Sequence, residues 1–566
     1  MRRNLKCLWP ALWLFLTGAC LAACQSASRG GPLKFRITLA REVAGEAAAG
    51  RLLVFMSDSP QSSQSLSVGF IPDNTWMAAM EVANLAPGQT IEFNPDLKAY
   101  PRPFSQARPG AYQIMALLDT DHSYAYSGQN EGDLCSPVIK LRNLTPANGG
   151  SVALTLNRRT VGAVRVAETE NVKLVEFQSQ LLTAFWKRPV VMRAGVVLPP
   201  SHHRSSRQTY PVLYRIHGFG GDHTMAWQDG EALVQAMREG KEQEMIHVFL
   251  DGSFQTGHHL FADSANNGQW GRALTEEFIP HLEERFRLIA RPEARFLTGH
   301  SSGGWSALWL QITYPDFFGG TWSTAPDPVD FHHFIGIDVT PGSSDNAYRA
   351  RDGKPRNLAR IGGREILSIE EFARQEAVKG EQGGQLDSFE WVWSPRGPDG
   401  RPLRLFHRET GELNPAAQLA WRQYDIHAIL EKNWDRLGPR LRGKINIIVG
   451  GDDTFHLEAA VARLCDFFRR KGSDAVCEIT PGRDHDNLYQ PSQSYPDGLA
   501  ARIHKEIQAK LGAHLSASQK QKPKLTAKKA QPKTKTAKGR AAPAQAKNPS
   551  SKEGKSEPIT PAVDTE

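Results

Sequence analysis

A glycine-rich pentapeptide, Gly299-His300-Ser301-Ser302-Gly303, constrains the fold of this chain more than any other stretch. An apolar run at residues 294–298 leads into it, and a helix-compatible run at residues 305–310 leads out. This context predicts a strand, a sharp turn and a helix, the arrangement in which G-x-S-x-G exposes a serine hydroxyl above a sheet. Ser301 is therefore the candidate nucleophile. Taken alone the pentapeptide is also compatible with an ordinary glycine-rich turn.

Composition and charge set the outer limits of the interpretation. The chain has 566 residues, 40% of them hydrophobic, which is too long for one ordinary domain and enough for two folded units. Residues 516–566 contain 12 Lys/Arg and 4 Asp/Glu, and they account for the whole formal charge of +8. Because the rest of the chain is balanced in charge, a nucleic-acid enzyme is disfavoured.

The N-terminal residues are typical of an export signal. Basic residues precede an apolar run, residues 8–19, that is shorter than a membrane span needs. Leu21-Ala22-Ala23-Cys24 resembles the lipobox of bacterial lipoproteins, which implies a lipid on Cys24. Since Gln25 follows instead of Asp, the resemblance implies an exported protein anchored at the outer membrane or in the periplasm. A secretory signal cleaved nearby, or a short uncleaved anchor, is the alternative.

Three of the six cysteines fall within the signal or at its end. Of the other three, Cys465 lies late in a predicted helix and Cys477 in the strand that follows, so these two can pair in an oxidising periplasm. The alternative is that Cys135, Cys465 and Cys477 are all buried free thiols, because spacing alone does not define connectivity.

Residues 32–160 carry short strand-like segments separated by turns such as Asp73-Asn74 and Pro95-Asp96. This pattern predicts an all-β, immunoglobulin-like sandwich. Its strands are predicted at residues 33–39, 51–56, 90–93, 110–118, 138–141 and 151–156. Tyr112, Tyr124 and Tyr126 are candidates for a ligand surface or for core packing.

From about residue 172 strands alternate with helices, which predicts an α/β domain with a mostly parallel sheet. Function is expected in the loops at the edge where the strands end. The predicted strands are residues 190–198, 212–216, 246–250, 294–298, 320–323, 445–449 and 475–479, with a helix at 276–286. Within this domain, a stretch at about residues 328–439 has weak periodicity, and we expect a lid or an elaboration of the scaffold.

These patterns divide the chain into five parts: a signal at 1–24, a tether at 25–31, the sandwich at 32–160, the α/β domain at 170–512 and a tail at 513–566. The tail is rich in Lys, Ala and Pro, and we expect it to be disordered because it has little apolar surface to bury. It can contact anionic envelope polymers or remain a solvated extension.

Two further loops supply what acyl transfer by a serine requires. His217-Gly218-Phe219-Gly220-Gly221 follows an apolar strand, and its glycines allow a close approach of the backbone to a substrate oxygen. The N–H groups of Phe219 and Ser302 are the expected oxyanion donors. After the last strand comes His485, the candidate base, because a histidine there can take the hydroxyl proton of serine.

The acid that orients the base is expected after a late strand. Residues 445–449 are followed by Gly450-Gly451-Asp452-Asp453, whose G-x-x-D spacing favours Asp453 over its neighbour Asp452. One of the two aspartates can instead cap the helix that begins near Phe455. Ser301, Asp453 and His485 then follow one another in the chain order of α/β-hydrolases.

At these motifs, together with Pro211–Gly221, the chain resembles the Putative esterase family of α/β-hydrolases over roughly residues 177–511. That family includes enterochelin esterases, esterase D, feruloyl and acetyl-xylan esterases and envelope mycolyltransferases. The resemblance implies an α/β-hydrolase fold and no cofactor. The roles that it implies are Ser301 as nucleophile, Asp453 as acid, His485 as base, and Phe219 and Ser302 as oxyanion donors. Where family members place an aromatic residue shortly after the histidine, this chain places Asp486-Asn487-Leu488 before Tyr489.

No metal site is predicted, because the pairs His202-His203, His258-His259 and His332-His333 lack carboxylate or cysteine partners at zinc spacing. Asp327 and Asp330 follow a strand and are candidates for substrate contact or for turn formation.

The hypothesis is a serine carboxylesterase of the bacterial envelope that acts on a small-molecule or polysaccharide ester. An acyltransferase of envelope sugars or lipids with the same triad is one alternative. A non-catalytic envelope-binding lipoprotein is the other.

Overall fold

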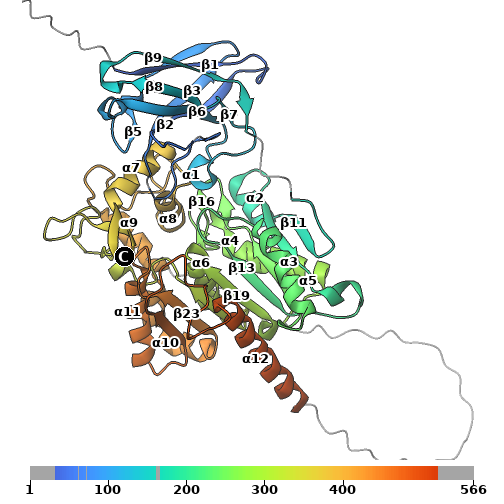
Figure 1. The fold of residues 1–566 in the computed structure, drawn as a ribbon. Helices are drawn as coiled ribbons and strands as arrows, with labels where there is room; N and C mark the ends of the chain where they lie inside the picture. Colours follow the sequence, from blue (N-terminus) through green and yellow to red (C-terminus); the bar gives the residue numbers. More distant parts are fainter. Residues whose placement is uncertain (1–31, 62, 72, 161–165, 521–566) are drawn as a thin grey trace, which may run out of the picture.

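The structure is a computed structural model that describes residues 32–61, 63–71, 73–160 and 166–520. A β-rich body built from the N-terminal part sits against a larger α/β body (Figure 1). The predicted signal, Cys24, the tether and residues 521–566 of the predicted tail lie outside the described residues.

The N-terminal body is a β-sandwich, as predicted. In its smaller sheet β1 (Lys34–Leu39) lies between β4 (Thr90–Phe93) and β9 (Ser151–Leu156), antiparallel to the first and parallel to the second. The larger sheet has the order β10 (Arg158–Arg159), β7 (Leu134–Cys135), β6 (Gly110–Asp119), β2 (Ala48–Ser57), β3 (Thr75–Leu85) and β5 (Ala99–Tyr100), and β8 (Ile139–Leu144) also pairs with β6. Phe35, Phe93 and Phe104 form ring contacts in the core between the sheets.

Strand β3 was not predicted. Its sequence is rich in Ala and Met, which favour helices, and it lacks the β-branched alternation of a typical strand. It is nevertheless held by the whole length of β2, with Leu53 opposite Ala79 and Phe55 opposite Met77. Pairing and burial in the sheet therefore override the local preference of this segment.

The α/β body contains an eight-stranded sheet with the order and directions of the α/β-hydrolase fold, as predicted. Only β12 runs against its two neighbours, and the other pairs of the sheet are parallel. The order is β11 (Val172–Gln178), β12 (Val191–Val197), β14 (Ile246–Leu250), β13 (Val212–Ile216), β19 (Arg295–His300), β20 (Gly320–Thr324), β23 (Ile445–Gly450) and β24 (Val476–Thr480). The central strands are buried along their length except at Arg215 of β13, which explains their mostly apolar sequences.

Helices cover this sheet. They are α2 (Gln180–Trp186), α3 (Met225–Arg238), α4 (Trp270–Arg272), α5 (Ile279–Phe286), α6 (Ser302–Thr313), α11 (Leu457–Arg470) and α12 (Leu499–Lys520). The helix predicted at residues 276–286 begins as a π-helix, Ala273–Phe278, and continues as α5. Helix α12 extends to Lys520, past the predicted start of the tail at residue 513.

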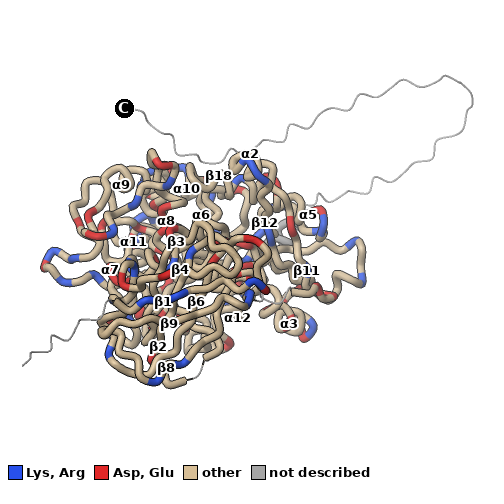
Figure 2. Tube along the Cα trace, turned by 90° about the horizontal axis from the view of Figure 1, so that it is seen from above, with Lys and Arg blue, Asp and Glu red and all other residues tan. Residues whose placement is uncertain are grey.

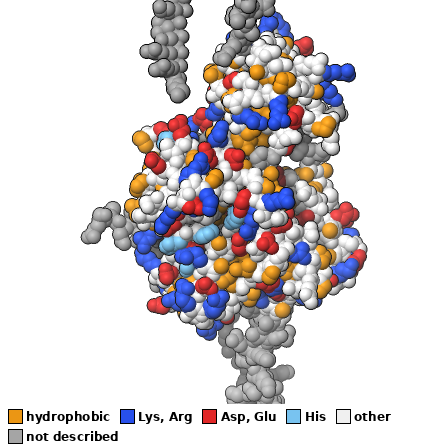
Figure 3. Space-filling model, turned by 60° about the vertical axis from the view of Figure 1, so that its left-hand side comes forward, with side chains coloured by type: hydrophobic (Ala, Val, Ile, Leu, Met, Phe, Trp, Pro, Cys, Tyr) orange, Lys and Arg blue, Asp and Glu red, His pale blue; other side chains and the backbone are white. Residues whose placement is uncertain are grey.

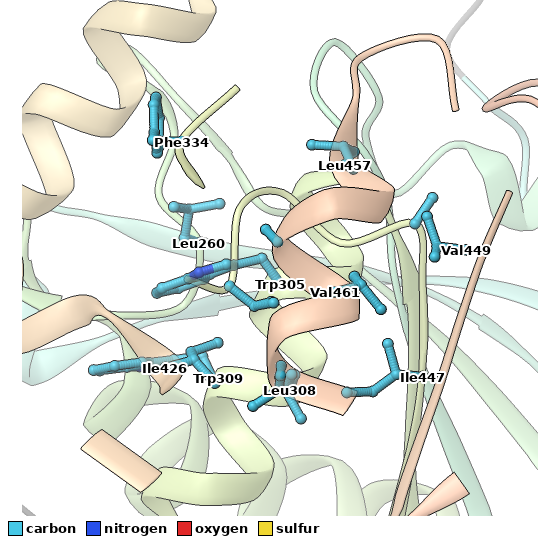
Figure 4. Packing of buried hydrophobic residues seen from close by; sticks show 14 of the residues in the cluster. Leu260, Trp305, Leu308, Trp309, Phe334, Ile426, Ile447, Val449, Leu457 and Val461 are labelled. Carbon is cyan, nitrogen blue, oxygen red and sulfur yellow. The ribbon is translucent and has the colours of Figure 1, made fainter. Parts of the chain in front are cut away.

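The inserted region, for which the sequence left a lid or a scaffold elaboration open, is folded into helices and a hairpin. It contains β21 (Asn357–Ile361), β22 (Arg364–Ser368), α7 (Ile369–Lys379), α8 (Gln385–Trp393), α9 (Pro415–Trp421) and α10 (Ile426–Leu441). Trp393 of α8 packs on Trp305 of α6 with ring centroids 5.1 Å apart, and on Trp421 at 5.0 Å. Figure 4 shows Phe334 and Ile426 in the same apolar cluster as Trp305 and Trp309 of α6.

Two observations bear on the expected partners. Lys/Arg and Asp/Glu are interspersed along the described chain, in agreement with its balanced charge outside the tail (Figure 2). Within the described ranges, none of the helices combines the length and the apolar character needed to cross a bilayer.

Cys465 of α11 and Cys477 of β24 form a disulfide, with Cα atoms 5.7 Å apart. Of the two alternatives that the sequence left open, pairing is therefore the one found, and Cys135 is a half-buried free thiol. The bond joins the helix that follows the candidate acid to the strand that precedes the candidate base.

We expect the double variant Cys465→Ala/Cys477→Ala to lose about 3 kcal/mol of stability, because the bond closes a short loop and so restricts the unfolded chain. Thermal unfolding followed by circular dichroism should show a melting temperature lower by several degrees. Cys135→Ala is the matched control and should melt like the wild type. Equal melting of the wild type with and without reductant, in a sample shown to be reduced, would contradict the prediction.

Candidate active site

Ser301 sits in a strained turn between β19 and α6. Its φ of 58° and ψ of −124° place it outside the regions that L-residues favour, and its N–H donates to the Thr324 carbonyl at 3.0 Å. Glycine is required on both sides of the turn. A Cβ on Gly299 would collide with the Gly303 carbonyl, and one on Gly303 with the carbonyl of Ile216 in β13. The predicted strand, sharp turn and helix are thus present around Ser301.

His485 and Asp453 form a buried pair. The Nδ1 of His485 lies 2.9 Å from Oδ2 of Asp453, and the two residues are 6% and 0% exposed. The other carboxylate oxygen, Oδ1, accepts from the backbone N–H of Phe455 at 2.9 Å. Asp453 therefore both contacts the histidine and caps the turn before α11. The rival Asp452 is exposed, and its N–H donates to the Arg483 carbonyl.

The surroundings of His485 favour its protonated form. Burial alone would lower the pKa of His485, but the hydrogen bond and charge of Asp453, with the charge of Asp327, raise it above its usual value. The ring lies 4.4 Å from that of His300 and 4.8 Å from that of Phe455, measured between centroids. Tyr489 contacts His300 in turn, so the aromatic residue that comes late after the histidine still packs at this site.

The loop after β13 lies against the serine. A Cβ on Gly218 would be 3.3 Å from the Cβ of Ser301, so the backbone at Gly218 passes directly beside the candidate nucleophile. The next residue is Phe219. Within the described ranges, the backbone N–H groups of Phe219 and Ser302 donate to no protein acceptor, which leaves both free for a ligand.

Both ring nitrogens of His217 make polar contacts that hold this loop. Its Nε2 accepts from the Gly252 N–H at 2.8 Å, and its Nδ1 lies 2.7 Å from the Gly218 carbonyl. Asp251 lies 3.7 Å from the Nε2 of His217 and 2.9 Å from Nδ1 of His223. Burial would raise the pKa of Asp251, but the neighbouring imidazoles of His217 and His223 hold it well below its usual value.

A second carboxyl group, not predicted to join the triad, lies beside the elbow. The Oγ of Ser302 donates to Oδ2 of Asp327 at 2.6 Å, and Nε2 of Gln385 in α8 donates to the same Oγ at 3.2 Å. Burial raises the pKa of Asp327 to about 6, against the lowering effects of Ser302, His485 and Ser301. Asp330, the other candidate from that segment, instead bonds to His427, Arg463 and His332 away from the elbow.

Three groups in the described chain have carboxylate or histidine atoms close enough together to share a cation: Glu242/His247/His504, Asp330/His332/Asp425 and Asp119/Asp121/Asp133. The first two also contain a protein cation, because Arg215 lies 2.8 Å from His504 and Arg463 lies 2.6 Å from Asp330. The third caps a turn of the sandwich. Histidine side chains are visible on the α/β body below the sandwich, among acidic and basic groups (Figure 3).

The three tyrosines of the sandwich have different positions. Tyr112 and Tyr124 are buried in it, whereas Tyr126 reaches the α/β body, where its hydroxyl donates to the Gly221 carbonyl at 2.9 Å. Sequence reasoning missed Gln385 and this role of Tyr126, because both depend on how separate segments dock. The only signal in the sequence was the cluster of tyrosines itself.

Comparison with known proteins finds similarity to esterases over part of the α/β body. Residues 190–399 match the family model named Putative esterase. Over 145 residues the chain is 30% identical to an esterase of Mycobacterium tuberculosis, which covers 25% of this chain and 31% of that protein. Over 143 residues it is 25% identical to an endo-1,4-beta-xylanase/feruloyl esterase of Xylanibacter ruminicola, which covers 24% of this chain and 20% of that protein. The chain thus spans about a third or less of the length of these curated relatives.

Two solved structures are also similar. A ferulic acid esterase matches with a TM-score of 0.37 and 16% identity over 60% of this chain and 98% of its own. A fluorophosphonate-binding serine hydrolase of Staphylococcus aureus, FphF, matches with a TM-score of 0.34 and 14% identity over the same shares.

We expect Asp453→Asn to lower the pKa of His485 from above its usual value to below it, because burial remains when the carboxylate charge is removed. Histidine NMR titration, assigned with a His485→Gln variant, measures this shift. Asp452→Asn is the matched control and should leave the titration unchanged.

The same pairing predicts the effect of pH on stability. Because the folded pKa of His485 is raised, the stabilisation from this group is fully present below the unfolded pKa and is lost as pH rises through the folded value.

For the Asp453→Asn variant, an unchanged titration of His485 would contradict the electrostatic role of this pair.

Proposed function

Starting from the esterase match of residues 190–399, we propose that the protein is a serine carboxylesterase with Ser301, Asp453 and His485 as its triad. The observation that carries the proposal is the buried pair of His485 and Asp453, whose Nδ1 and Oδ2 atoms are 2.9 Å apart. An acid bonded to Nδ1 leaves Nε2 for a hydroxyl proton. Ser301 comes from the strained turn of the same sheet edge, as this chemistry requires.

The mechanism follows from these positions. His485 Nε2 takes the proton of the Ser301 hydroxyl as Oγ bonds to the carbonyl carbon of the ester. The negative charge moves to the carbonyl oxygen, which accepts hydrogen bonds from the N–H groups of Phe219 and Ser302. The carbon–oxygen bond to the alcohol then breaks, and His485 returns its proton to the leaving oxygen. Water, deprotonated by His485, attacks the acyl-enzyme and releases the acid and free Ser301.

Asp453 orients the base and stabilises its charged form. Its Oδ1 is held by the amide of Phe455, so its Oδ2 is directed at Nδ1 of His485. The raised pKa of His485 means that the neutral base forms only as pH rises through that value. We therefore expect ester turnover to increase over the same pH range.

For the substrate we propose a small-molecule or polysaccharide ester. Several similar proteins are named for ferulic or feruloyl esters, and these esters are the first candidates to test. Transfer of the acyl group to an added sugar or lipid alcohol instead of water is the alternative outcome. Acyl transfer is recognised when the ester formed with the added alcohol exceeds the free acid released by hydrolysis.

For the location we propose export and a lipid anchor on Cys24, followed by Gln25, at the outer membrane or in the periplasm. The basic stretch beyond residue 520 would then face anionic envelope polymers. Cys24→Ser should abolish incorporation of radiolabelled palmitate and move the protein out of the membrane fraction. Cys20→Ser is the matched control, and retention of label in Cys24→Ser would overturn the anchor.

We expect Ser301→Ala to abolish labelling by a fluorophosphonate probe and to lower kcat on p-nitrophenyl esters by at least about 10⁴-fold. The nucleophile is lost while the fold is kept, because alanine fits the space of serine. Ser473→Ala, on a distant turn, serves as the matched control and should be labelled like the wild type. A folded wild type that neither reacts with the probe nor turns over any ester would favour the non-catalytic binding protein.

A further inference from the structure

A short helix of the sandwich, α1 (Tyr124–Ser127), lies between the sandwich and the α/β body (Figure 1). It is fixed to the end of β6 by Asp119. That carboxylate accepts from the N–H of Ser123 at 3.3 Å and from the N–H of Tyr124 at 3.1 Å. The helix therefore moves with the large sheet of the sandwich and not as a loose loop.

On one side α1 contacts the loop that carries the oxyanion donor. The hydroxyl of Tyr126 donates to the Gly221 carbonyl at 2.9 Å, and its ring meets the ring of Phe219 edge-on with centroids 4.9 Å apart. Burial raises the pKa of Tyr126 well above its usual value, so the hydroxyl stays protonated and remains a donor. Tyr126 thus contacts both the side chain of the donor residue Phe219 and the end of its loop.

On the other side α1 supports the turn between α7 and α8. A Cβ on Gly380 would be 2.9 Å from the Cβ of Ala125, so backbone packs directly on the helix. This turn ends at Gln385, whose side chain donates to Ser302 at 3.2 Å. The second oxyanion donor is therefore also linked to α1, through Gln385.

The sandwich holds α7 by a buried arginine. Arg51 of β2 is 1% exposed and donates to the carbonyls of Ala377 and Val378 at 3.2 Å each. These carbonyls lie in the last turn of α7, where a positive charge is favourable. The contact fixes the segment that leads into Gln385.

From these contacts we propose that the N-terminal sandwich is a structural part of the active site, with Tyr126 as the positioning residue of the oxyanion loop. The inference rests on the proposed esterase function for its catalytic consequence, but the positioning of residues 217–221 is independent of it. Tyr126 does not touch the reacting atoms. It acts through Phe219.

The test compares Tyr126→Phe with Tyr112→Phe in the full-length chain. Each variant removes one hydrogen bond from a tyrosine hydroxyl to a backbone carbonyl. Tyr126 donates to Gly221 in the α/β body, whereas Tyr112 donates to Arg108 at 2.6 Å within the sandwich. For Tyr126→Phe we expect faster hydrogen–deuterium exchange of the amides of residues 217–221. We also expect kcat on p-nitrophenyl esters to fall roughly three- to tenfold with little change in KM, since one hydrogen bond holds the donor loop.

Tyr112→Phe should change neither the exchange of residues 217–221 nor kcat. Exchange of these amides at the wild-type rate in Tyr126→Phe, with melting unchanged, would overturn the proposal whether or not the protein hydrolyses esters. Absence of probe labelling in the wild type would count against the esterase function alone. A rise in KM without a fall in kcat would assign Tyr126 to substrate binding and overturn its positioning role.

Discussion

The close approach of three backbone segments around Ser301 is the constraint on which the rest of the structure depends. The turn from β19 into α6 touches the end of β13 so closely that Gly299 and Gly303 have no room for a side chain. The Thr324 carbonyl of β20 holds the Ser301 amide from the other side. Parallel strands are required for this contact, because only then do β13, β19 and β20 end at the same edge.

The same edge receives the ends of β23 and β24. Because these strands are adjacent and parallel, the loops that follow them bring Asp453 and His485 to hydrogen-bond distance although they are 32 residues apart. The disulfide between Cys465 and Cys477 ties the helix and strand that lie between them. The sheet therefore supplies the geometry, and each loop supplies one chemical group.

Local patterns predicted those parts of the molecule whose structure is locally determined. The elbow around Ser301, the loop with Phe219 and most strands of the sheet follow from glycine placement and apolar runs. The choice between Asp452 and Asp453 rested on spacing alone, and the structure buries Asp453 beside His485. Strand β3 escaped prediction because pairing with β2 overrides its Ala- and Met-rich sequence.

Docking between segments far apart in the chain could not be predicted. Tyr126 meets Gly221 across 95 residues, and Gln385 meets Ser302 across 83. No local pattern encodes such pairs, since their residue types are common and their meaning depends on the packed sandwich and insert. The contacts of Tyr126 and Gln385, which support the site from outside, are therefore the part that the sequence did not predict.

The buried carboxyl of Asp327 links these supporting contacts to the electrostatics of the site, because it contacts Ser302 and its charge acts on His485. In the proposed mechanism, a negative charge beside Ser302 opposes the developing oxyanion, whereas the same charge favours the imidazolium of His485. Burial raises the pKa of Asp327 to about 6. Its bond to Ser302 and the bond from Gln385 to the same hydroxyl orient the turn. Gln385 of the insert and Asp327 thus hold the same Ser302 hydroxyl, and the charge of Asp327 also acts on His485.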